Sequence, residues 1–374
     1  MKRMAFFISL TLLILFGLAS GQLEVGDRPI SGAVGDFNKD GLQDLAVANL
    51  GSNDVYILLG IGNGLFKEGP RLDVGLLPSS IAVGDFNRKD VRAGERTYLD
   101  LAVANSGSDN VTILLLEVKA EALKLKTSKE VEVGESPSAV AVGDFNRDGD
   151  QDLVVANSGS DDVTILLGDG RGGFKDERFR VGNRPSSLAV GDFDRDGCQD
   201  LVVANELSND VSILLGKCDG TFEDQERFGV GISPSSVVVG DFDRDAILDL
   251  AIANPGSNDV YVLLGKGDGT FVHPVVFEVG MRPVSITIGD FDKDRILDLA
   301  VANDLSNDIY IFLGEGDGTF KMKERREVGE HPSSIITGDF DRDGCPDLAV
   351  TNELSDDVYI LLGKCDGTFE IPRR

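Results

Sequence analysis

The chain of 374 residues has 64 acidic and 36 basic side chains, and its formal net charge of −28 argues against a nucleic-acid partner, whose phosphates such a surface repels. It has two histidines, no tryptophan and four cysteines, and no Ser-His-Asp or Cys-His arrangement stands apart from a repeated pattern. The composition therefore offers little for catalysis.

Residues 1–21 have the layout of a secretory signal peptide. Two basic residues at positions 2 and 3 precede an apolar run over residues 5–18, and small residues follow at 19–21. The run is shorter than the roughly 20 residues of a membrane span, and no later stretch is long enough, so an uncleaved anchor is only the alternative. We expect a secreted or extracellular protein, periplasmic if the source is bacterial, with no membrane span after signal removal.

Residues 22–374 repeat one unit seven times. The first Asp of each acidic loop lies 49, 59, 48, 49, 49 and 49 residues after the previous one. Each unit holds four short runs rich in β-branched residues and bounded by Gly, Asn, Asp or Pro, as in residues 187–193, 200–204, 211–215 and 222–230. This pattern predicts an all-β fold, a seven-bladed β-propeller with four antiparallel strands per blade.

The two ends of the chain predict how the ring closes. The chain ends five residues after Phe369, too soon for a full outer strand in the last blade. At the other end, residues 22–26 read Gln-Leu-Glu-Val-Gly and resemble the Phe-Glu-Val-Gly of residues 277–280. We therefore expect the N-terminal strand to complete the last blade, so that residues 22–374 form one domain.

Each repeat carries an acidic loop of the form Asp-Phe-[Asp/Asn]-[Lys/Arg]-Asp-x-x-x-Asp, intact in six copies. Side chains at loop positions 1, 3, 5 and 9, with the carbonyl of position 7, offer most of the six to eight oxygens that calcium prefers. Asp, Asn and Gly also form plain turns, but six copies in one register favour metal. An EF-hand is excluded because position 12 falls on Val47, Val155 and Val203 instead of Glu.

We predict four to six calcium ions. The predicted ligand residues, given loop by loop, are Asp36, Asn38, Asp40, Leu42 and Asp44; Asp144, Asn146, Asp148, Asp150 and Asp152; Asp192, Asp194, Asp196, Cys198 and Asp200; Asp241, Asp243, Asp245, Ile247 and Asp249; Asp290, Asp292, Asp294, Ile296 and Asp298; and Asp339, Asp341, Asp343, Cys345 and Asp347.

The loops differ at position 6. Four have Gly there, but the loops at Asp241 and Asp290 have Ala246 and Arg295. If position 6 needs a positive φ, a residue other than Gly adds strain of order 1 kcal/mol. We expect these two loops to bind calcium more weakly.

The second copy of the loop is broken. Asp85 and Asn87 are followed by an insertion, so that Asp100 lies 15 residues after Asp85 instead of 8. We predict that this loop is metal-free, with the cation supplied by Lys89, Arg92 or Arg96.

The four cysteines form two pairs in the same blade register. Cys198 and Cys218, like Cys345 and Cys365, are 20 residues apart and symmetric about a turn. Residues equidistant from a hairpin turn face each other across two strands, so an exported chain predicts two disulfides within blades. Two pairs of buried thiols are the alternative.

The loops, together with the Gly-Asp-Gly-Thr-Phe turns at residues 267–271 and 316–320 and the Asp-Gly-Thr-Phe turn at 366–369, resemble the FG-GAP/VCBS repeat family, whose propeller repeats also occur in integrin α-subunit heads. The resemblance covers essentially all of residues 22–374 and implies a calcium-binding propeller. Functions in this family range from adhesion to carbohydrate binding to accessory domains of enzymes, so it implies no single activity.

One position varies within the fixed frame, just before the Pro that joins two blades. Its basic members Arg28, Arg184, Arg282 and His331 are candidates to ring the central opening and bind an anionic group, a carboxylate or an acidic sugar. Solvent exposure without a role is the alternative.

The sequence thus predicts an exported, calcium-binding, non-catalytic and monomeric propeller that acts as an extracellular protein-binding or adhesion module. A calcium-stabilised lectin that binds acidic or other glycans is the alternative, although the lack of Trp and the presence of only five Tyr disfavour sugar stacking. A polysaccharide-active enzyme is least favoured, because the paired carboxylates of a glycosidase would here be committed to metal.

Overall fold

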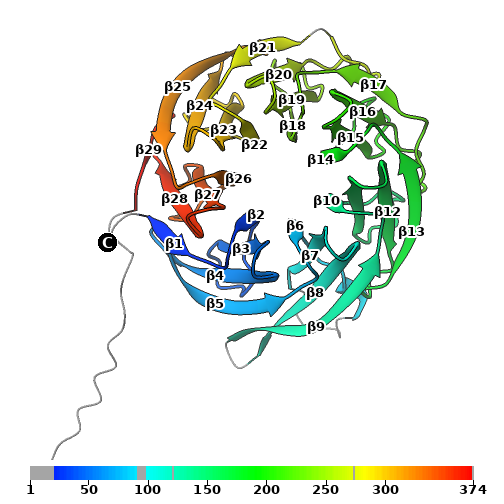
Figure 1. The fold of residues 1–374 in the computed structure, drawn as a ribbon, viewed down its shortest axis with the longest axis vertical. Coiled ribbons are helices and arrows are strands. Elements are labelled where there is room, and N and C mark those ends of the chain that lie inside the picture. The colour runs from blue at the N-terminus through cyan, green and yellow to red at the C-terminus, as the bar shows by residue number, and fades with distance from the viewer. Residues whose placement is uncertain (1–20, 91–97, 120–121, 273, 373–374) are drawn as a thin grey trace, which may run out of the picture.

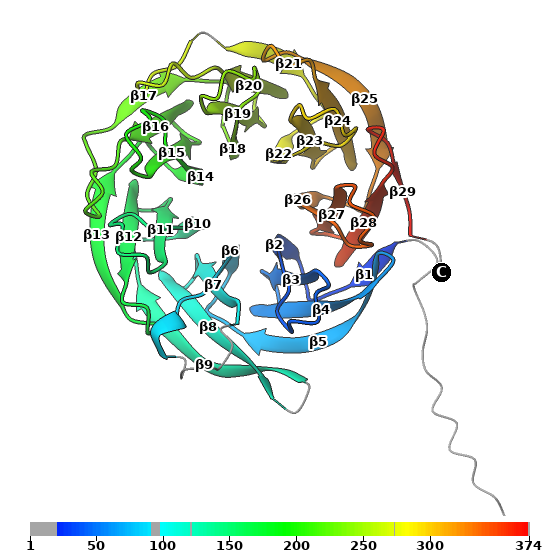
Figure 2. The same cartoon turned by 180° about the vertical axis from the view of Figure 1, so that it is seen from behind.

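The computed structural model describes residues 21–90, 98–119, 122–272 and 274–372. Seven antiparallel sheets surround a central opening (Figure 1, and from behind Figure 2). Within the described ranges the only helix is a short 3-10 turn, η1 (Arg88–Asp90), and no helix is long and apolar enough to cross a membrane. The predicted all-β, seven-bladed propeller is confirmed.

Strands follow the same order in every blade, from the central opening to the rim. The innermost strands are β2 (Pro29–Gly35), β6 (Pro78–Gly84), β10 (Pro137–Gly143), β14 (Pro185–Gly191), β18 (Ser236–Gly240), β22 (Pro283–Gly289) and β26 (Pro332–Gly338). The second strands are β3 (Asp44–Asn49), β7 (Asp100–Asn105), β11 (Asp152–Asn157), β15 (Asp200–Asn205), β19 (Asp249–Asn254), β23 (Asp298–Asn303) and β27 (Asp347–Asn352). The third strands are β4 (Asp54–Gly62), β8 (Asn110–Lys119), β12 (Asp162–Gly168), β16 (Asp210–Leu214), β20 (Asp259–Leu263), β24 (Asp308–Gly314) and β28 (Asp357–Gly363). The outer strands are β5 (Leu65–Asp73), β9 (Ala122–Glu132), β13 (Phe174–Arg180), β17 (Glu226–Gly229), β21 (Val275–Glu278), β25 (Phe320–Glu327) and, in the last blade, β29 (Phe369–Glu370) with β1 (Gln22–Glu24).

The hydrophobic core lies between neighbouring blades. Every residue of each second strand is buried, because both of its faces pack against a blade. Ala46 and Ala48 of one blade share a cluster with Leu101 and Val103 of the next, so small side chains leave room for large ones. The blades therefore hold one another in place, and none has a core of its own.

The N-terminal strand closes the ring, as predicted. β1 pairs antiparallel with β28, with Gln22 opposite Tyr359 and Glu24 opposite Asp357. The short β29 pairs with the other end of β28, where Phe369 lies opposite Gly363. The outer edge of the last blade is thus shared by the two ends of the chain (Figure 1).

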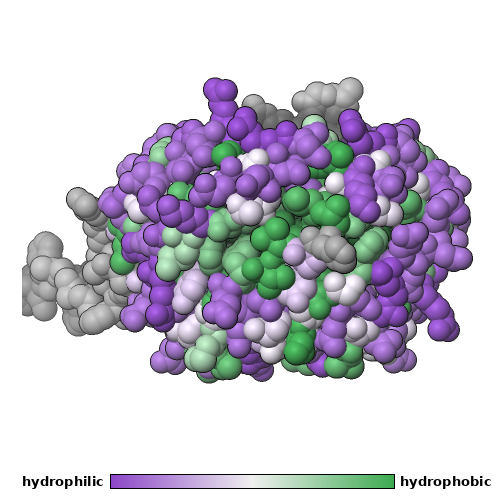
Figure 3. Space-filling model, turned by 90° about the horizontal axis from the view of Figure 1, so that it is seen from above, coloured by the Kyte–Doolittle hydropathy of each residue, from purple (hydrophilic) through white to green (hydrophobic). Residues whose placement is uncertain are grey.

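Outer strands are the irregular part of the repeat. In the fourth blade Phe222 forms only an isolated bridge to Gly216, and β17 starts at Glu226, so the first half of the strand predicted over residues 222–230 is wrong. The fifth blade has the same interruption, and Val272 and Val276 there are partly exposed. Hydrophobic residues also reach the surface in the side view of the ring (Figure 3). In the second blade, by contrast, β8 and β9 extend the hairpin past the rim (Figure 1).

Candidate metal loops and the opposite face

Each acidic loop connects the innermost strand of a blade to the second strand, and position 9 anchors it. In the fourth blade the carboxylate of Asp200 is fully buried at the start of β15. Its Oδ2 accepts a hydrogen bond from the amide of Phe193 and its Oδ1 accepts one from the amide of Gly216, both at 2.7 Å. Equivalent bonds occur in all seven blades, Asp100 of the broken loop included. Position 9 therefore holds three chain segments together.

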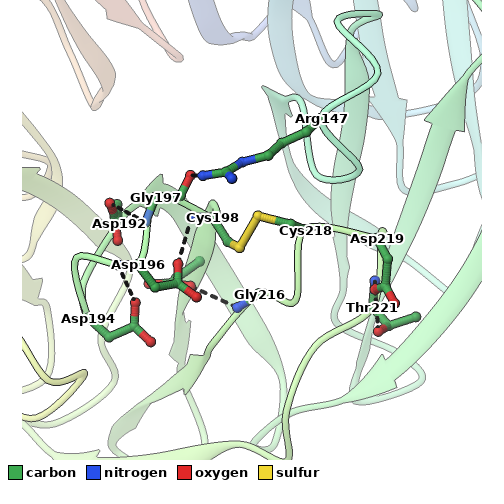
Figure 4. The surroundings of a disulfide bond; sticks show 11 residues. Arg147, Asp192, Asp194, Asp196, Gly197, Cys198, Gly216, Cys218, Asp219 and Thr221 are labelled. Atoms are coloured by element: carbon green, nitrogen blue, oxygen red, sulfur yellow. Dashed lines mark hydrogen bonds between the residues drawn. A yellow bond between two sulfur atoms is a disulfide. The ribbon is translucent and has the colours of Figure 1, made fainter.

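Positions 1, 3 and 5 shape the rest of the loop. Asp192 accepts from the amide of Gly197 at 3.0 Å, Asp194 from the amide of Asp196 at 3.1 Å, and Asp196 from the amide of Cys198 at 2.6 Å. These short-range bonds curl the backbone so that the carboxylates converge (Figure 4).

The converging carboxylates suit a hard cation. In the four loops with Asp at position 3, three carboxylates each place an oxygen within 4.8 Å of the others, as Asp192, Asp194 and Asp200 do. Burial raises the pKa of Asp200 to about 6, and the neighbouring Asp194 and Asp192 add to the rise. Burial likewise raises the pKa of Asp194. Full ionisation of such a cluster is unfavourable, because its carboxylates are buried and repel one another. A divalent cation would offset that repulsion.

An oxygen without a partner points to the same conclusion. Within the described part of the chain, the buried Oδ1 of Asp192 has no hydrogen-bond partner, and neither has that of Asp144, Asp290 or Asp339 at position 1 of their loops. Asp85 in the broken loop shares this feature, so a partnerless oxygen does not by itself mark a metal. A partnerless oxygen and clustered carboxylates occur together in the loops at Asp192, Asp290 and Asp339, which could therefore hold a metal ion.

Position 6 has a positive φ in every intact loop. Gly197 has φ +84°, and Ala246 and Arg295 adopt φ 66° and 69°. The conformational premise for weaker binding by these two loops is thus present. Position 4, always Lys or Arg, also has a positive φ, as in Arg147 at 55°, a feature we did not predict.

In the third and sixth blades, the residue at position 4 connects its loop to the next one. The guanidinium of Arg147 donates to the carbonyl of Gly197 in the following loop (Figure 4), and the ammonium of Lys293 donates to Gly344 in the same way. The sequence shows basic residues at a constant position but not where they reach, because that depends on how the blades are placed.

The broken loop sends its cations into the next blade. The guanidinium of Arg88 contacts the buried carboxylate of Asp150 at 2.8 Å, and the ammonium of Lys89 contacts its other oxygen. Burial would raise the pKa of Asp150, but the two cations outweigh it and lower that pKa. Of the three cations that we considered for this loop, Lys89 thus pairs with the next loop, and Arg92 and Arg96 lie outside the described residues.

Both predicted disulfides are present, Cys198 with Cys218 and Cys345 with Cys365. The strand register differs by one residue from the one that suggested them. A turn centred on residue 208 would place Leu201 opposite Leu215, but Leu201 pairs with Leu214, and both cysteines lie beyond the paired strands. Cys198 occupies position 7 of the metal loop, so the bond fastens that loop to the turn before the outer strand (Figure 4). In the fifth blade Ile247 packs over Gly267 at the same place.

The face at the opposite end of the strands carries the basic residues predicted to bind anions. Arg28 pairs with Glu353. Arg184 lies 3.2 Å from Glu206, and Arg282 lies 2.9 Å from Asp304. His331 also contacts Asp304, at 2.8 Å. An anion would have to compete with these carboxylates, which sequence reasoning missed.

Exposed apolar side chains occupy the same face. At each junction between blades, two positions lie side by side. One is the second residue before the Pro that joins the blades, and the other is the second residue after the Asn that ends the second strand. Met281 and Leu305 are such a pair, and the amide of Leu305 donates to the carbonyl of Met281. At four successive junctions, from the third blade to the seventh, these places hold large apolar residues that are 50% to 62% exposed. This apolar arc consists of Leu207, Ile232, Met281, Leu305 and Leu354.

Comparison with known proteins identifies the repeat. A family model described as an FG-GAP-like repeat matches residues 36–88, 144–203, 192–252, 241–301 and 290–350, well over half of the chain. This chain belongs to the FG-GAP-like repeat family. The matches to the FG-GAP-like repeat skip residues 89–143, which include the loop insertion and the extended hairpin of the second blade.

Solved structures share the fold of this FG-GAP-like repeat protein at low sequence identity, and no curated protein matches it. The structure of BBS1N in complex with ARL6DN has 14% identity and a TM-score of 0.63, covering 95% of this chain and 98% of that one. A Lactobacillus plantarum protein has 12% identity and a TM-score of 0.63, and the match covers 91% of this chain and 94% of that one. Hydrazine synthase of Kuenenia stuttgartiensis has 15% identity and a TM-score of 0.64, and the match covers 92% of this chain and 98% of that one. Since one of these is a protein complex and another is named as an enzyme, the fold alone does not decide function.

Proposed function

We propose that this chain is an exported, calcium-stabilised, non-catalytic propeller that binds a protein partner through the face carrying the apolar arc. The arc is the main support. Five exposed apolar residues in equivalent places at successive junctions are more than a soluble surface needs, and Leu and Met set among arginines suit a protein interface.

Charges on the same face support a protein partner. Arg184 and Arg282 are about half exposed and already paired with carboxylates, so the face offers both signs of charge beside its apolar groups. Such paired charges give register and specificity more than affinity. An anionic group on the partner would add to binding by taking over one of these guanidinium groups, and a role in adhesion is the form that binding outside the cell would take.

Calcium and export complete the proposal. Six intact loops fit calcium by their ligand spacing, and four of them bring three carboxylates together. Residues 1–21 would direct export, leaving residues 22–374 as one propeller, and two disulfides suit an oxidising compartment.

Capture of a partner from a surface extract of the source, with calcium present, tests this function. The variant Leu207→Ser, Met281→Ser, Leu354→Ser should lose most of the capture, by about tenfold or more, because apolar anchors carry interface energy. Ile61→Ser with Met322→Ser is the matched control, since both residues are equally exposed but lie off the arc. Retention of the same protein by the arc variant, or binding to a glycan array and to no protein, would refute the proposal.

A further inference from the structure

The rim at the fourth blade lacks a charged side chain that every other blade has. In each blade, one outer-strand residue pairs with the Asp or Asn that begins the third strand. The fourth blade has Gly229 there, whereas the other six have Glu24 (from the N-terminal strand), Asp73, Glu132, Arg180, Glu278 and Glu327. Charged side chains on an edge strand discourage another strand from pairing with it. The edge of β17 lacks this protection at Gly229.

The fifth blade lacks a second charge beside the first. In six blades an outer Phe pairs with a third-strand Gly, and in five of these the next residue is charged, namely Lys67, Lys175, Glu223, Lys321 and Glu370. In the fifth blade the next residue is Val272, which is 39% exposed. Two separate positions of the repeat are therefore uncharged on neighbouring blades.

A pocket of about 350 Å³ is lined by both of these residues. Its size falls in the range of roughly 300 to 1,000 Å³ that binding sites occupy. The rings of Phe228 and Phe271 form part of its wall and pack edge to face, with 5.4 Å between their centroids. Leu263 and Pro274 also line it, and residue 273 lies outside the described part of the chain. A wall of aromatic and aliphatic groups suits another aromatic ring.

Charges around the pocket favour an uncharged occupant. Among the described residues, Lys266 is the only charged residue that lines the pocket, and it is exposed. Asp268, two residues further on, interacts electrostatically with Lys266 and offsets its charge. On the edge strand, Arg227 is paired with Asp210, and Glu226 adds a negative charge. These charges favour neither an acidic nor a basic side chain, whereas the face of an aromatic ring would attract the ammonium.

The outer edge of β17 offers backbone hydrogen bonds beside the pocket. β17 is the last strand of its sheet, and the following amide, that of Val230, donates inward to the carbonyl of Asn209. Successive residues of a strand direct their backbone groups to opposite sides, so those of Gly229 and Arg227 point outward. A strand added here would alternate its side chains between the two faces of the sheet. Those on the same face as Phe228 would lie over the pocket, which Phe228 lines.

We propose that this edge binds an extended, uncharged peptide segment of a partner protein, which pairs with β17 and places an aromatic side chain in the pocket. The edge supplies backbone hydrogen bonds, and the pocket selects the side chain, as in other cases of strand addition. The site shares no residue with the apolar arc or with the metal loops, and it depends on neither.

Fluorescence anisotropy of a dye-labelled, capped peptide Ser-Val-Phe-Val-Ser with the whole protein tests the site. We expect saturable 1:1 binding that is about tenfold weaker or more for Val272→Lys and for Gly229→Glu, because each restores a charge that other blades have. The peptide with Ala in place of Phe should lose as much, since it lacks the ring. Gly229→Glu should still fold, because no atom of the described residues lies within 4 Å of a Cβ at that position.

Met322→Lys is the matched control, because it adds the same charge at an exposed apolar residue of the outer strand β25. It should bind the peptide as the parent does. The variant Leu207→Ser, Met281→Ser, Leu354→Ser should also bind like the parent, so failure of this site leaves the function proposed for the apolar arc untouched.

Two N-methylated peptides separate strand addition from capture by the pocket alone. Methylation of the Phe amide, or of the two Val amides, blocks groups that point to opposite sides of an added strand, so one of these peptides should lose binding and the other keep it. Equal binding of both refutes the proposal. So do equal binding of the Ala peptide, parent-like binding by Val272→Lys, and self-association of the parent that Val272→Lys abolishes while no peptide binds.

Discussion

At position 6 of the metal loop, a single residue decides where the arginine of the neighbouring blade lies. A Cβ on Gly197 would come 2.4 Å from the guanidinium of Arg147, closer than any real contact. In the fifth and sixth blades, where position 6 is Ala246 or Arg295, the preceding arginine lies against a different glycine of that blade, as Arg195 does against Gly267. Gly at position 6 therefore leaves room for the arginine of the preceding blade to reach the loop, as Arg147 does at Gly197.

Ala246→Gly should stabilise the protein by about 1 kcal/mol, because Gly adopts the positive φ without strain. Gly197→Ala should cost at least as much, since it adds the contact with Arg147 to the same strain. Denaturant unfolding checks both, and calcium titration should show tighter binding in the first variant. Gly229→Ala is the control, because no atom of the described residues lies within 4 Å of its added Cβ. A destabilised Ala246→Gly would mean that position 6 does not limit the loop.

At the scale of elements, the disulfides replace a packing contact found in other blades. Cys218 adopts φ 58°, in a place where the fifth blade has Gly267 under the side chain of Ile247. A residue other than Gly is strained there, so the covalent bond must offset that strain. The fifth blade shows that the fold tolerates the unbridged alternative.

Replacing the bridge by the pair from the fifth blade, Cys198→Ile with Cys218→Gly, should cost less than Cys198→Ala with Cys218→Ala. A bridge between residues 20 apart contributes about 3 kcal/mol in the loop-entropy view. The double Ala variant loses that and keeps the strained φ at position 218, whereas the Ile and Gly pair removes the strain and restores the contact. Unfolding midpoints of the three proteins decide the order, and equal losses would contradict the equivalence of the two arrangements.

Deletion of residues 22–27 should destabilise the ring and promote aggregation. β1 covers the edge of β28, and Val25 is buried beside it, so the deletion exposes an unpaired strand edge. Removing residues 373–374 is the control and should leave the unfolding midpoint unchanged. Size-exclusion chromatography and thermal unfolding measure the outcome. A monomeric, equally stable protein without residues 22–27 would show that ring closure does not depend on this strand.

Elements that repeat, and the closure of the ring, could be predicted because spacing and strand patterns are local in the sequence. Outer strands could not be placed well, since each pairs on one side only, and residues 223–225 of the fourth blade belong to no strand. Contacts between blades, such as those of Arg88 and Lys89 with Asp150, were missed because they depend on the placement of one blade against the next. The apolar arc was missed for the same reason.

For the whole molecule, the balance of charge governs stability. The formal net charge is −28, and the acidic loops gather on one end of the ring while the basic residues of the other face are paired. Without cations, the carboxylates of each loop repel one another in a partly buried place. If calcium binds the folded loops, as we propose, and not the unfolded chain, it should stabilise the whole ring.

Stability should therefore depend on pH with opposite sign in chelator and in calcium. Burial raises the pKa of Asp44, Asp152, Asp200, Asp249 and Asp298 to about 6, above their usual 3.8. The folded chain without metal thus binds protons more tightly than the unfolded chain, and the stability it gains at low pH is lost as pH rises from 4 toward 6. In calcium, protons compete with the metal for the same carboxylates, so stability should fall as pH drops through that window. Thermal unfolding should show midpoint shifts on the order of 2 °C or more, upward on acidification in chelator and downward in calcium. The same slope in both buffers, or a midpoint that calcium does not raise at neutral pH, would contradict the metal assignment.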